Sequence, residues 1–374
     1  MNDRRHLQQT VLHDRHLAAG ARIGPFAGFE MPIQYQGGIV EEHQAARRRA
    51  ALFDTCHMGE FLVVGEGALR DLQRLLTCPL ANLRQGRCRY SLMCNEQGGV
   101  IDDLLVYRLA EDQFMLVVNA AGRRRDWQWL REQVGAETRL IDQSDTVAKI
   151  DLQGPLAPSI AESVLEHSIR DLVYFAFHEN RYQGEDLLVS RTGYTGEIGF
   201  EFYCSTGLAG ALWDDCLRQG ATPAGLGARD TLRLEMGMPL YGHELHDQRN
   251  AAEAGLGRAI ADDRWFVGAD QIRNPSLSRQ KLRGLALNDR RAARAGDPVL
   301  AVDGRTVLGT VTSGSFAPSL GYAVALAYID RAAAIVGDPV LIGGRRQLSG
   351  KIVSPPFYRE GTARAETGRF FPDV

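Results

Sequence analysis

The alternation of apolar and polar residues predicts a mixed order of strands and helices through the first three quarters of the chain. Strong helix formers mixed with charges predict a helix over residues 40–52, and an apolar run predicts a strand over 60–64. Two further runs, residues 89–93 and 100–109, flank a turn that ends in Gly98-Gly99, which predicts a β-hairpin. Other strands are expected over residues 114–118, 146–152 and 187–190, and other helices over 67–76, 127–134, 157–166 and 209–219.

The last quarter of the chain has a different pattern. From about residue 281 the sequence breaks into short β-like runs separated by Gly, Asp and Pro, and long helical patterns are absent. These runs are residues 284–287, 299–302, 306–312, 323–329 and 340–342. They predict a small all-β domain and leave two architectures open, a barrel and a sandwich. We therefore expect an α+β fold of antiparallel sheets with flanking helices, followed by this β domain.

Composition narrows the class of protein. A chain of 374 residues is too long for one hydrophobic core, and its 44% hydrophobic and 24% charged residues are those of a folded protein. The formal net charge of −3 argues against a nucleic-acid partner. No stretch has the length and apolar character of a membrane span or signal peptide, and the six cysteines have the irregular spacing of reduced thiols. We expect a cytoplasmic protein with no membrane or nucleic-acid partner.

Two adjacent carboxylates interrupt the apolar strand expected over residues 100–109. Strand side chains alternate between faces, so only one of Asp102 and Asp103 can point inward. The alternation places Asp103 on one face with Ile101 and Tyr107, and Asp102 on the other. A buried carboxylate needs a partner, which favours a functional role. The plainer alternative is that both residues are acceptors for the adjoining turn.

A glycine-rich segment, residues 190–201, is the second candidate for chemistry. Three of its glycines are spaced three residues apart, which fits neither the dinucleotide fingerprint nor the P-loop. Such spacing indicates a backbone that lies close to a neighbouring group or ligand, or a kinked turn between strands. Glu201 follows in an apolar stretch, where it is either a functional acceptor or an edge-strand glutamate that faces solvent.

A second glycine-rich loop, residues 223–228, leads into a predicted helix and places Arg229 in its first turn. A cation is unfavourable there because of the helix dipole, so Arg229 is expected to face a partner. Arg233 and Glu235 could instead tie this helix into a structural ion-pair network. The pair His243 and His246 lacks a third ligand in the sequence, and we expect no metal site.

These segments together resemble the aminomethyltransferase (T-protein) family of the glycine cleavage system. The matching segments run in family order along almost the whole chain: residues 12–13, 20–22, 26–32, 53–59, 95–104, 117–120, 191–197, 225–230 and 312–318. The resemblance implies a three-domain cloverleaf around a central folate channel. The implied domains are residues 1–53 with 146–275, residues 54–145, and residues 280–374.

The resemblance also implies a reaction. A lipoylated H-protein carrying an aminomethyl group would give its one-carbon unit to tetrahydrofolate, yielding methylenetetrahydrofolate and ammonia. Asp103 matches the family aspartate beside the folate nitrogens, Glu201 the glutamate at the pterin amino edge, and Arg229 the arginine of the folate site. The remaining expected channel residues are Tyr90, Tyr107, Asn119, Met58 and Tyr194.

Several positions depart from the family pattern, and two alternatives stay open. Phe29 stands where many members have tryptophan, Pro25 where many have aspartate, Cys56 where many have serine and Ala251 where many have proline. One alternative is a tetrahydrofolate-dependent demethylase of a small methyl donor on the same scaffold. The other is a non-catalytic folate-binding protein, but the Lys-Gly-Cys-Tyr segment of those relatives is replaced here by residues 238–244.

Overall fold

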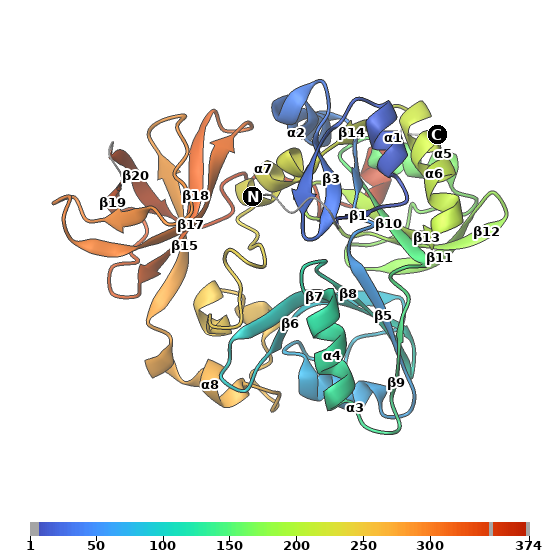
Figure 1. Cartoon of the computed structure of the whole chain (residues 1–374), viewed down its shortest axis with the longest axis horizontal. Coiled ribbons are helices and arrows are strands. Elements are labelled where there is room, and N and C mark those ends of the chain that lie inside the picture. The colour runs from blue at the N-terminus through green and yellow to red at the C-terminus, as the bar shows by residue number, and fades with distance from the viewer. Residues whose placement is uncertain (1–6, 344–346, 372–374) are drawn as a thin grey trace.

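The computed structural model describes residues 7–343 and 347–371. Figure 1 shows three lobes: a six-stranded sheet with its helices, a five-stranded sheet with its helices, and a β-barrel at the left. A small sheet of β1 (Gln8–Gln9), β3 (Phe29–Gln34) and β2 (Arg22–Phe26) lies beside the first lobe. The mixed α/β class and the C-terminal β domain expected from the sequence are confirmed. The predicted domain boundaries remain predictions.

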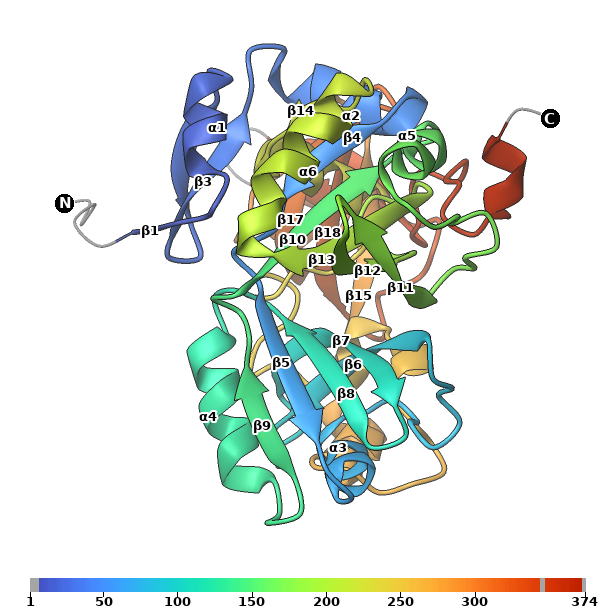
Figure 2. The ribbon, with the colours of Figure 1, turned by 90° about the vertical axis from the view of Figure 1, so that its right-hand side faces the viewer.

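The six-stranded sheet takes its strands from distant parts of the sequence. Its order is β11 (Phe177–Tyr182), β12 (Glu185–Ser190), β13 (Gly199–Ser205), β10 (Val147–Gln153), β4 (Ala51–Asp54) and β14 (Thr222–Ala224). Helices α5 (Ala157–Val164) and α6 (Thr206–Arg218) pack on one face of this sheet (Figure 2). Ile150 and Leu152 of β10 join the core there with Trp213. The opposite face of β10 and β13 carries polar side chains and forms much of the candidate site.

The five-stranded sheet is built around the predicted hairpin. Its order is β6 (Arg87–Cys94), β7 (Val100–Ala110), β8 (Gln113–Val118), β5 (Gly59–Val64) and β9 (Arg139–Asp142). Helices α3 (Ala68–Leu75) and α4 (Arg123–Gln133) bury Leu72 and Leu130 against Leu104 and Val106 of β7. Residues 241–272 pack on the hairpin, where Phe266 meets Leu92.

The C-terminal β domain is a closed barrel, which decides between the two architectures that the sequence left open. Its strands close in the order β15 (Gln280–Leu287), β18 (Tyr322–Asp330), β17 (Val307–Ala317), β16 (Pro298–Leu300), β19 (Pro339–Ile342) and β20 (Leu348–Val353). The closing pair is β15 with β20, which aligns Leu285 with Ile352. Alternate alanines of β18, at 323, 325 and 327, fill the interior with little volume, which suits a small barrel.

The described residues also form several shorter helices outside these sheets. They are α1 (His13–Ala18), α2 (Gly38–Arg48), α7 (Leu226–Glu235), α8 (Ala269–Arg273), η2 (Ala251–Ala254), η3 (Gly257–Ala259), η4 (Pro275–Leu277) and η5 (Thr367–Phe370). Within the described ranges, no helix combines the length and the apolar character that a membrane crossing needs.

A buried ion network joins α2 and α7 to the barrel. Glu235 accepts from Arg47 Nη2 at 2.9 Å and from the backbone N–H of Ser319 at 2.8 Å. His43 Nε2 lies 3.2 Å from the same carboxylate, and Arg47 Nη1 lies 2.8 Å from Glu197. The structural role that the sequence left open for Glu235 is the one observed.

Two local predictions were wrong. The helix predicted over residues 40–52 ends at Arg48, because Leu52 pairs with Leu152 in the sheet and this pairing overrides local helix propensity. Ile101 does not share a face with Asp103 but packs with Leu104 and Val106. A register shift in the β6–β7 pairing, a β-bulge, displaces Ile101 from the regular alternation.

Candidate functional site

Asp103 lies half-buried in a small hydrogen-bonded group. Tyr90 OH donates to its Oδ2 at 3.0 Å, and Asn119 Nδ2 donates to its Oδ1 at 3.0 Å. Burial and the neighbouring Asp102 raise the pKa of Asp103 to about 7, even though both donors stabilise the carboxylate. Two partly buried neutral donors thus hold a carboxyl group whose pKa is about 7.

Asp102 is fully buried and shares Asn119 with Asp103. It accepts from the backbone N–H of Asn119 at 2.9 Å and from Asn119 Nδ2 at 2.8 Å. Neither aspartate serves the hairpin turn, where the side chain of Asn95 instead accepts from Gly99 N–H at 2.8 Å. The plainer alternative, that the two aspartates are turn acceptors, was wrong.

Asp102 has a second carboxyl neighbour, Asp126 from the first turn of α4. Both side chains are fully buried and lie within hydrogen-bonding reach of each other. Burial raises the pKa of Asp102 well above its usual range, and the charge of Asp126 raises it further. Two carboxylates so close disfavour the ionisation of both, so the pair binds a proton more tightly than either aspartate would alone.

Glu201 lies inside the six-stranded sheet on β13, with 3% of its surface exposed. The alternative of an edge-strand glutamate facing solvent was therefore wrong. Its Oε2 accepts from Thr192 at 2.5 Å, Tyr203 at 3.1 Å and Tyr107 at 3.3 Å. Tyr107 reaches across from β7 of the other lobe, so this carboxylate joins the two sheets.

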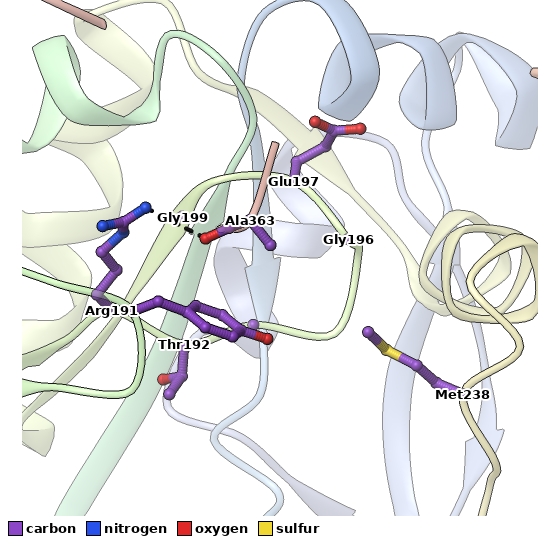
Figure 3. A pocket seen from close by; sticks show the side chains of 9 residues that line it. Arg191, Thr192, Gly196, Glu197, Gly199, Met238 and Ala363 are labelled. Atoms are coloured by element: carbon purple, nitrogen blue, oxygen red, sulfur yellow. Dashed lines mark hydrogen bonds between the residues drawn. The ribbon is translucent and has the colours of Figure 1, made fainter. Parts of the chain in front are cut away.

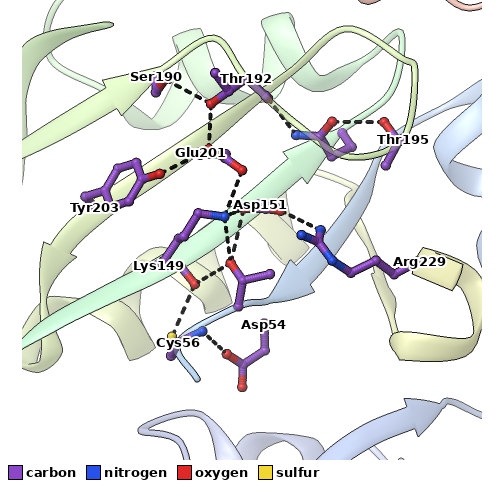
Figure 4. Close-up of polar contacts among 12 residues, drawn as sticks. Asp54, Cys56, Lys149, Asp151, Ser190, Thr192, Thr195, Glu201, Tyr203 and Arg229 are labelled. Atoms are coloured by element: carbon purple, nitrogen blue, oxygen red, sulfur yellow. Dashed lines mark hydrogen bonds and ion pairs between the residues drawn. The ribbon is translucent and has the colours of Figure 1, made fainter. Parts of the chain in front are cut away.

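Two further residues of the site, Lys149 and Asp151 on β10, were not predicted from the sequence. Lys149 Nζ lies 2.7 Å from Glu201 Oε1 and 2.8 Å from Asp151 Oδ1. The other oxygen of Asp151 lies 2.7 Å from Arg229 Nη1. These four residues form a chain of alternating charge, Glu201–Lys149–Asp151–Arg229, which we call the charge array (Figure 4).

Tyr194 lies beside Arg229 of the charge array. The guanidinium of Arg229 is 5.1 Å from the centre of its ring, and Tyr194 OH donates to the carbonyl of Pro239. Burial raises the pKa of Tyr194, the charge of Asp103 adds to this rise, and the nearby arginines oppose it. Met58, the last predicted channel residue, packs with Tyr107 and Tyr203 in one hydrophobic cluster.

The glycine-rich segment 190–201 is held by close packing, as its composition indicates. A Cβ at Gly193 would collide with Gln153, and one at Gly196, where φ is +82°, would collide with Met236. Figure 3 shows the small pocket behind the segment, where Arg191 donates to the carbonyl of Ala363 at 3.2 Å. These contacts fix the loop that carries Tyr194.

A separate basic cavity lies beside β6. It is lined by Arg84, Arg87 and Arg89 together with Cys88 and Phe175. Two of these arginines are held by backbone carbonyls, Arg87 by Tyr174 and Arg89 by Pro79.

The two histidines of the His-x-x-His pair turn to different neighbours. His243 Nδ1 lies 3.3 Å from the carbonyl of Thr312, and His246 Nδ1 accepts from Gln248 N–H at 3.2 Å. In the part of the chain that the structure describes, no group of three or more potential ligands could hold a metal ion.

The predicted site residues thus form two groups, and Tyr194 packs against Arg229 of the second. Tyr90 and Asn119 hold Asp103. The second group holds Glu201, Tyr107 and Arg229, and to it the structure adds Lys149, Asp151 and Thr192.

Both parts of the chain match models of one family. Residues 12–264 match the GCVT N-terminal domain, and residues 280–359 match the glycine cleavage T-protein C-terminal barrel domain. The aminomethyltransferase of Symbiobacterium thermophilum is 46% identical over 332 residues, which span 84% of this chain and 87% of that protein. The aminomethyltransferase of Halothermothrix orenii is 41% identical over 322 residues, spanning 84% and 89%.

A solved structure agrees with these matches. The crystal structure of glycine cleavage system aminomethyltransferase T from Bartonella henselae superposes with a TM-score of 0.89 at 33% identity. The superposition covers 95% of this chain and 99% of that one, so it includes every unit of the fold. The chain therefore belongs to the glycine cleavage T-protein family.

Proposed function

We propose that this protein is a tetrahydrofolate-dependent aminomethyltransferase of the glycine cleavage system. It would take the one-carbon unit from an aminomethyl-dihydrolipoyl H-protein, release ammonia and the dihydrolipoyl H-protein, and form 5,10-methylenetetrahydrofolate. Family membership and the names of the relatives support this proposal, and they do not favour the demethylase or binding-protein alternatives.

The single observation that carries the chemistry is the setting of Asp103. It is the half-buried member of the aspartate pair, each of its oxygens has one protein donor, and its pKa is about 7. A carboxylate oxygen has two lone pairs, so each oxygen keeps capacity for a ligand N–H. The residues present therefore fit an amine-bearing ligand.

Tetrahydrofolate, when bound, supplies the amine that accepts the one-carbon unit. Asp103 would accept a hydrogen bond from that N–H and stabilise positive charge that develops beside it. Tyr90 and Asn119 would fix the orientation of the Asp103 carboxylate through the hydrogen bonds described above. Whether Asp103 also takes the proton depends on its ionisation, and a pKa of about 7 is suited to either role.

The second group of residues would hold the ligand. Glu201 and Arg229 are proposed to contact the pterin, and Tyr107, Met58 and Tyr194 to shape the binding site. The basic cavity at Arg84, Arg87 and Arg89 offers cations to an anionic part of a ligand or partner.

A turnover assay tests the proposal. Purified protein, tetrahydrofolate and aminomethylated lipoyl H-protein should yield methylenetetrahydrofolate and ammonia in equal amounts. Asp103→Asn should lower kcat/KM by about 100-fold or more, the usual contribution of a positioned acid or base. Asp145→Asn, which changes an aspartate whose side chain is 86% exposed, is the matched control and should be unaffected.

Two results would contradict the proposal. Equal turnover by wild type and Asp103→Asn would remove Asp103 from the chemistry. Folate binding without aminomethyl transfer, together with demethylation of a small methyl donor, would replace the proposed activity with the demethylase alternative.

A further inference from the structure

Asp126 has a buried oxygen that no donor of the described residues reaches. Its side chain comes from the first turn of α4 and is fully buried. Its Oδ1 accepts from Nε and Nη2 of Arg125, each at 3.3 Å, whereas its Oδ2 has no hydrogen-bond partner in the part of the chain that the structure describes. A buried acceptor without a partner is costly, so this oxygen is expected to have one.

The carboxyl group of Asp102 lies within hydrogen-bonding reach of Asp126. Two carboxylates are acceptors only, so neither can donate to the other unless one of them holds a proton. A proton between them would give Asp126 the partner that its Oδ2 lacks. Each carboxyl oxygen has two lone pairs, so both oxygens of Asp102 would still accept from Asn119.

The charges around this pair also favour a proton. Asp103, the next residue on β7, is a third carboxyl group, and Arg125 is a cation whose side chain is 44% exposed. Arg125 is shared, because it also donates to Tyr241 OH at 2.8 Å and to the carbonyl of Ile101. Burial raises the pKa of Tyr90 and of Tyr241, so both are neutral and supply no charge. Three neighbouring carboxylates repel one another, and one shared proton relieves this repulsion.

Asn119 connects the pair to Asp103. Its Nδ2 donates to Asp102 Oδ1 at 2.8 Å, to Asp103 Oδ1 at 3.0 Å and to the Asp103 carbonyl at 2.9 Å. An amide group can turn over and exchange its donor for its acceptor, and the amide oxygen would repel the Asp103 carboxylate. Asp102 prevents this turn, because it accepts from both the side chain and the backbone N–H of Asn119.

We propose that Asp126 is a positioning residue for Asp103. It shares a proton with Asp102, and this proton holds Asp102 where Asn119 must present its Nδ2 to Asp103. The inference rests on the proposed function, which gives the Asp103 carboxylate its part in aminomethyl transfer. It deepens that function by naming a residue that acts on Asp103 through two others.

Two substitutions separate this role from a purely structural one. Asp126→Asn replaces the shared proton with an N–H donor, so Asp102 keeps its hydrogen bond and its place. Asp126→Leu supplies no donor, so Asp102 loses that hydrogen bond and Asn119 is free to turn. The asparagine variant should keep kcat/KM within about threefold of wild type, and the leucine variant should lose about 10- to 100-fold, the scale expected for a misplaced catalytic group.

The titration of Asp103 is a readout that a purely structural residue would not move. In protein with isotopically labelled aspartate carboxyl carbons, NMR should give Asp103 a pKa of about 7 in wild type and the same value in Asp126→Asn. In Asp126→Leu this pKa should rise by about one unit, because losing a hydrogen bond to the carboxylate disfavours the ionised form. The acidic limb of the pH profile of kcat/KM should move with it.

Asp71→Leu is the matched control. Asp71 lies in the first turn of α3 on the same sheet, is 4% exposed, and accepts from Thr138 Oγ1 at 2.6 Å and from Gly135 N–H at 2.8 Å. Its loss should lower the thermal midpoint and leave the titration of Asp103 unchanged. A shift equal to that of Asp126→Leu would overturn the inference, because any destabilisation of this lobe would then be sufficient.

Three other results would overturn the inference. The first is an unchanged Asp103 titration in Asp126→Leu. The second is equal loss of kcat/KM in Asp126→Asn and Asp126→Leu, since the charge of Asp126 would then matter and a donor would not. The third is a pair of carboxylate signals from Asp102 and Asp126 in wild type at neutral pH, which decides the question even if the leucine variant does not fold.

Failure of the proposed function would be distinguishable. Absence of aminomethyl transfer by every protein, with the Asp103 titration shifted in Asp126→Leu alone, would contradict the proposed activity and support the positioning of Asp103. Transfer by wild type with no such shift would overturn this inference and leave the proposed activity in place.

Discussion

Lys149→Met should be one of the most destabilising substitutions in this chain. Methionine keeps the length of the side chain and loses the charge, so Glu201 Oε1 is left without its donor at 2.7 Å and Asp151 Oδ1 without its donor at 2.8 Å. Both carboxylates are at most 4% exposed, so water cannot replace the ammonium without rearrangement. Removing one partner of a buried ion pair typically costs about 3–5 kcal/mol, and two carboxylates depend on Lys149.

That loss is large against the total stability of a folded protein, about 5–15 kcal/mol. Urea unfolding followed by far-UV circular dichroism should show a midpoint far below that of wild type. Lys351→Met is the matched control, because this lysine lies exposed on a strand of the barrel and should change stability by less than about 0.5 kcal/mol.

Charge balance provides an internal check on the reasoning. The double variant Lys149→Leu/Asp151→Ala removes a whole ion pair, and replacing a buried pair by apolar residues is often close to neutral. It should therefore be more stable than Lys149→Met by about 1.5 kcal/mol or more, a non-additive result expected of residues in one network. A loss below about 1 kcal/mol in Lys149→Met would refute the argument, because the ammonium would then have no structural role.

Three further predictions follow from other parts of the molecule. If Asp103 acts as a carboxylate, its pKa of about 7 means that log kcat/KM should fall as pH is lowered through 7, and a flat profile down to pH 5 would contradict this role. Gly196→Ala should lower Tm more than Gly184→Ala, because both positions have φ near +80° but only at Gly196 would a Cβ meet a neighbour, Met236. Equal losses of Tm in the two variants would refute that contact. Glu235→Gln should cost about 3 kcal/mol in thermal unfolding, because it removes the charge that Arg47 and His43 share, whereas the exposed Glu360→Gln should be neutral. A thermal midpoint unchanged in Glu235→Gln would show that this network does not secure the barrel.

The periodicity of the sequence determined most of the elements. The hairpin of β6 and β7, the strands around it and the short runs of the barrel all follow from local alternation and turn chemistry, which act over a few residues. Helix α2 shows the limit, since residues 51–52 were predicted to continue the helix and instead form a strand that pairs with β10 and β14. Closure of the barrel likewise depends on the pairing of β15 with β20, more than 60 residues apart, which no local pattern encodes.

The candidate site likewise contains residues that the sequence predicts and residues that only the tertiary structure reveals. Asp103, Glu201 and Arg229 were expected because a charge inside an apolar stretch or at a helix start is visible in the sequence alone. Lys149 and Asp151 alternate with apolar residues just as the solvent face of an ordinary strand does, so nothing local distinguishes them. This face is buried because the loop with Thr192 and Tyr107 of the other lobe meet Glu201 of the neighbouring strand β13. Burial depends on which distant segments cover a surface, so the tertiary structure alone decided that these two charges belong to the site.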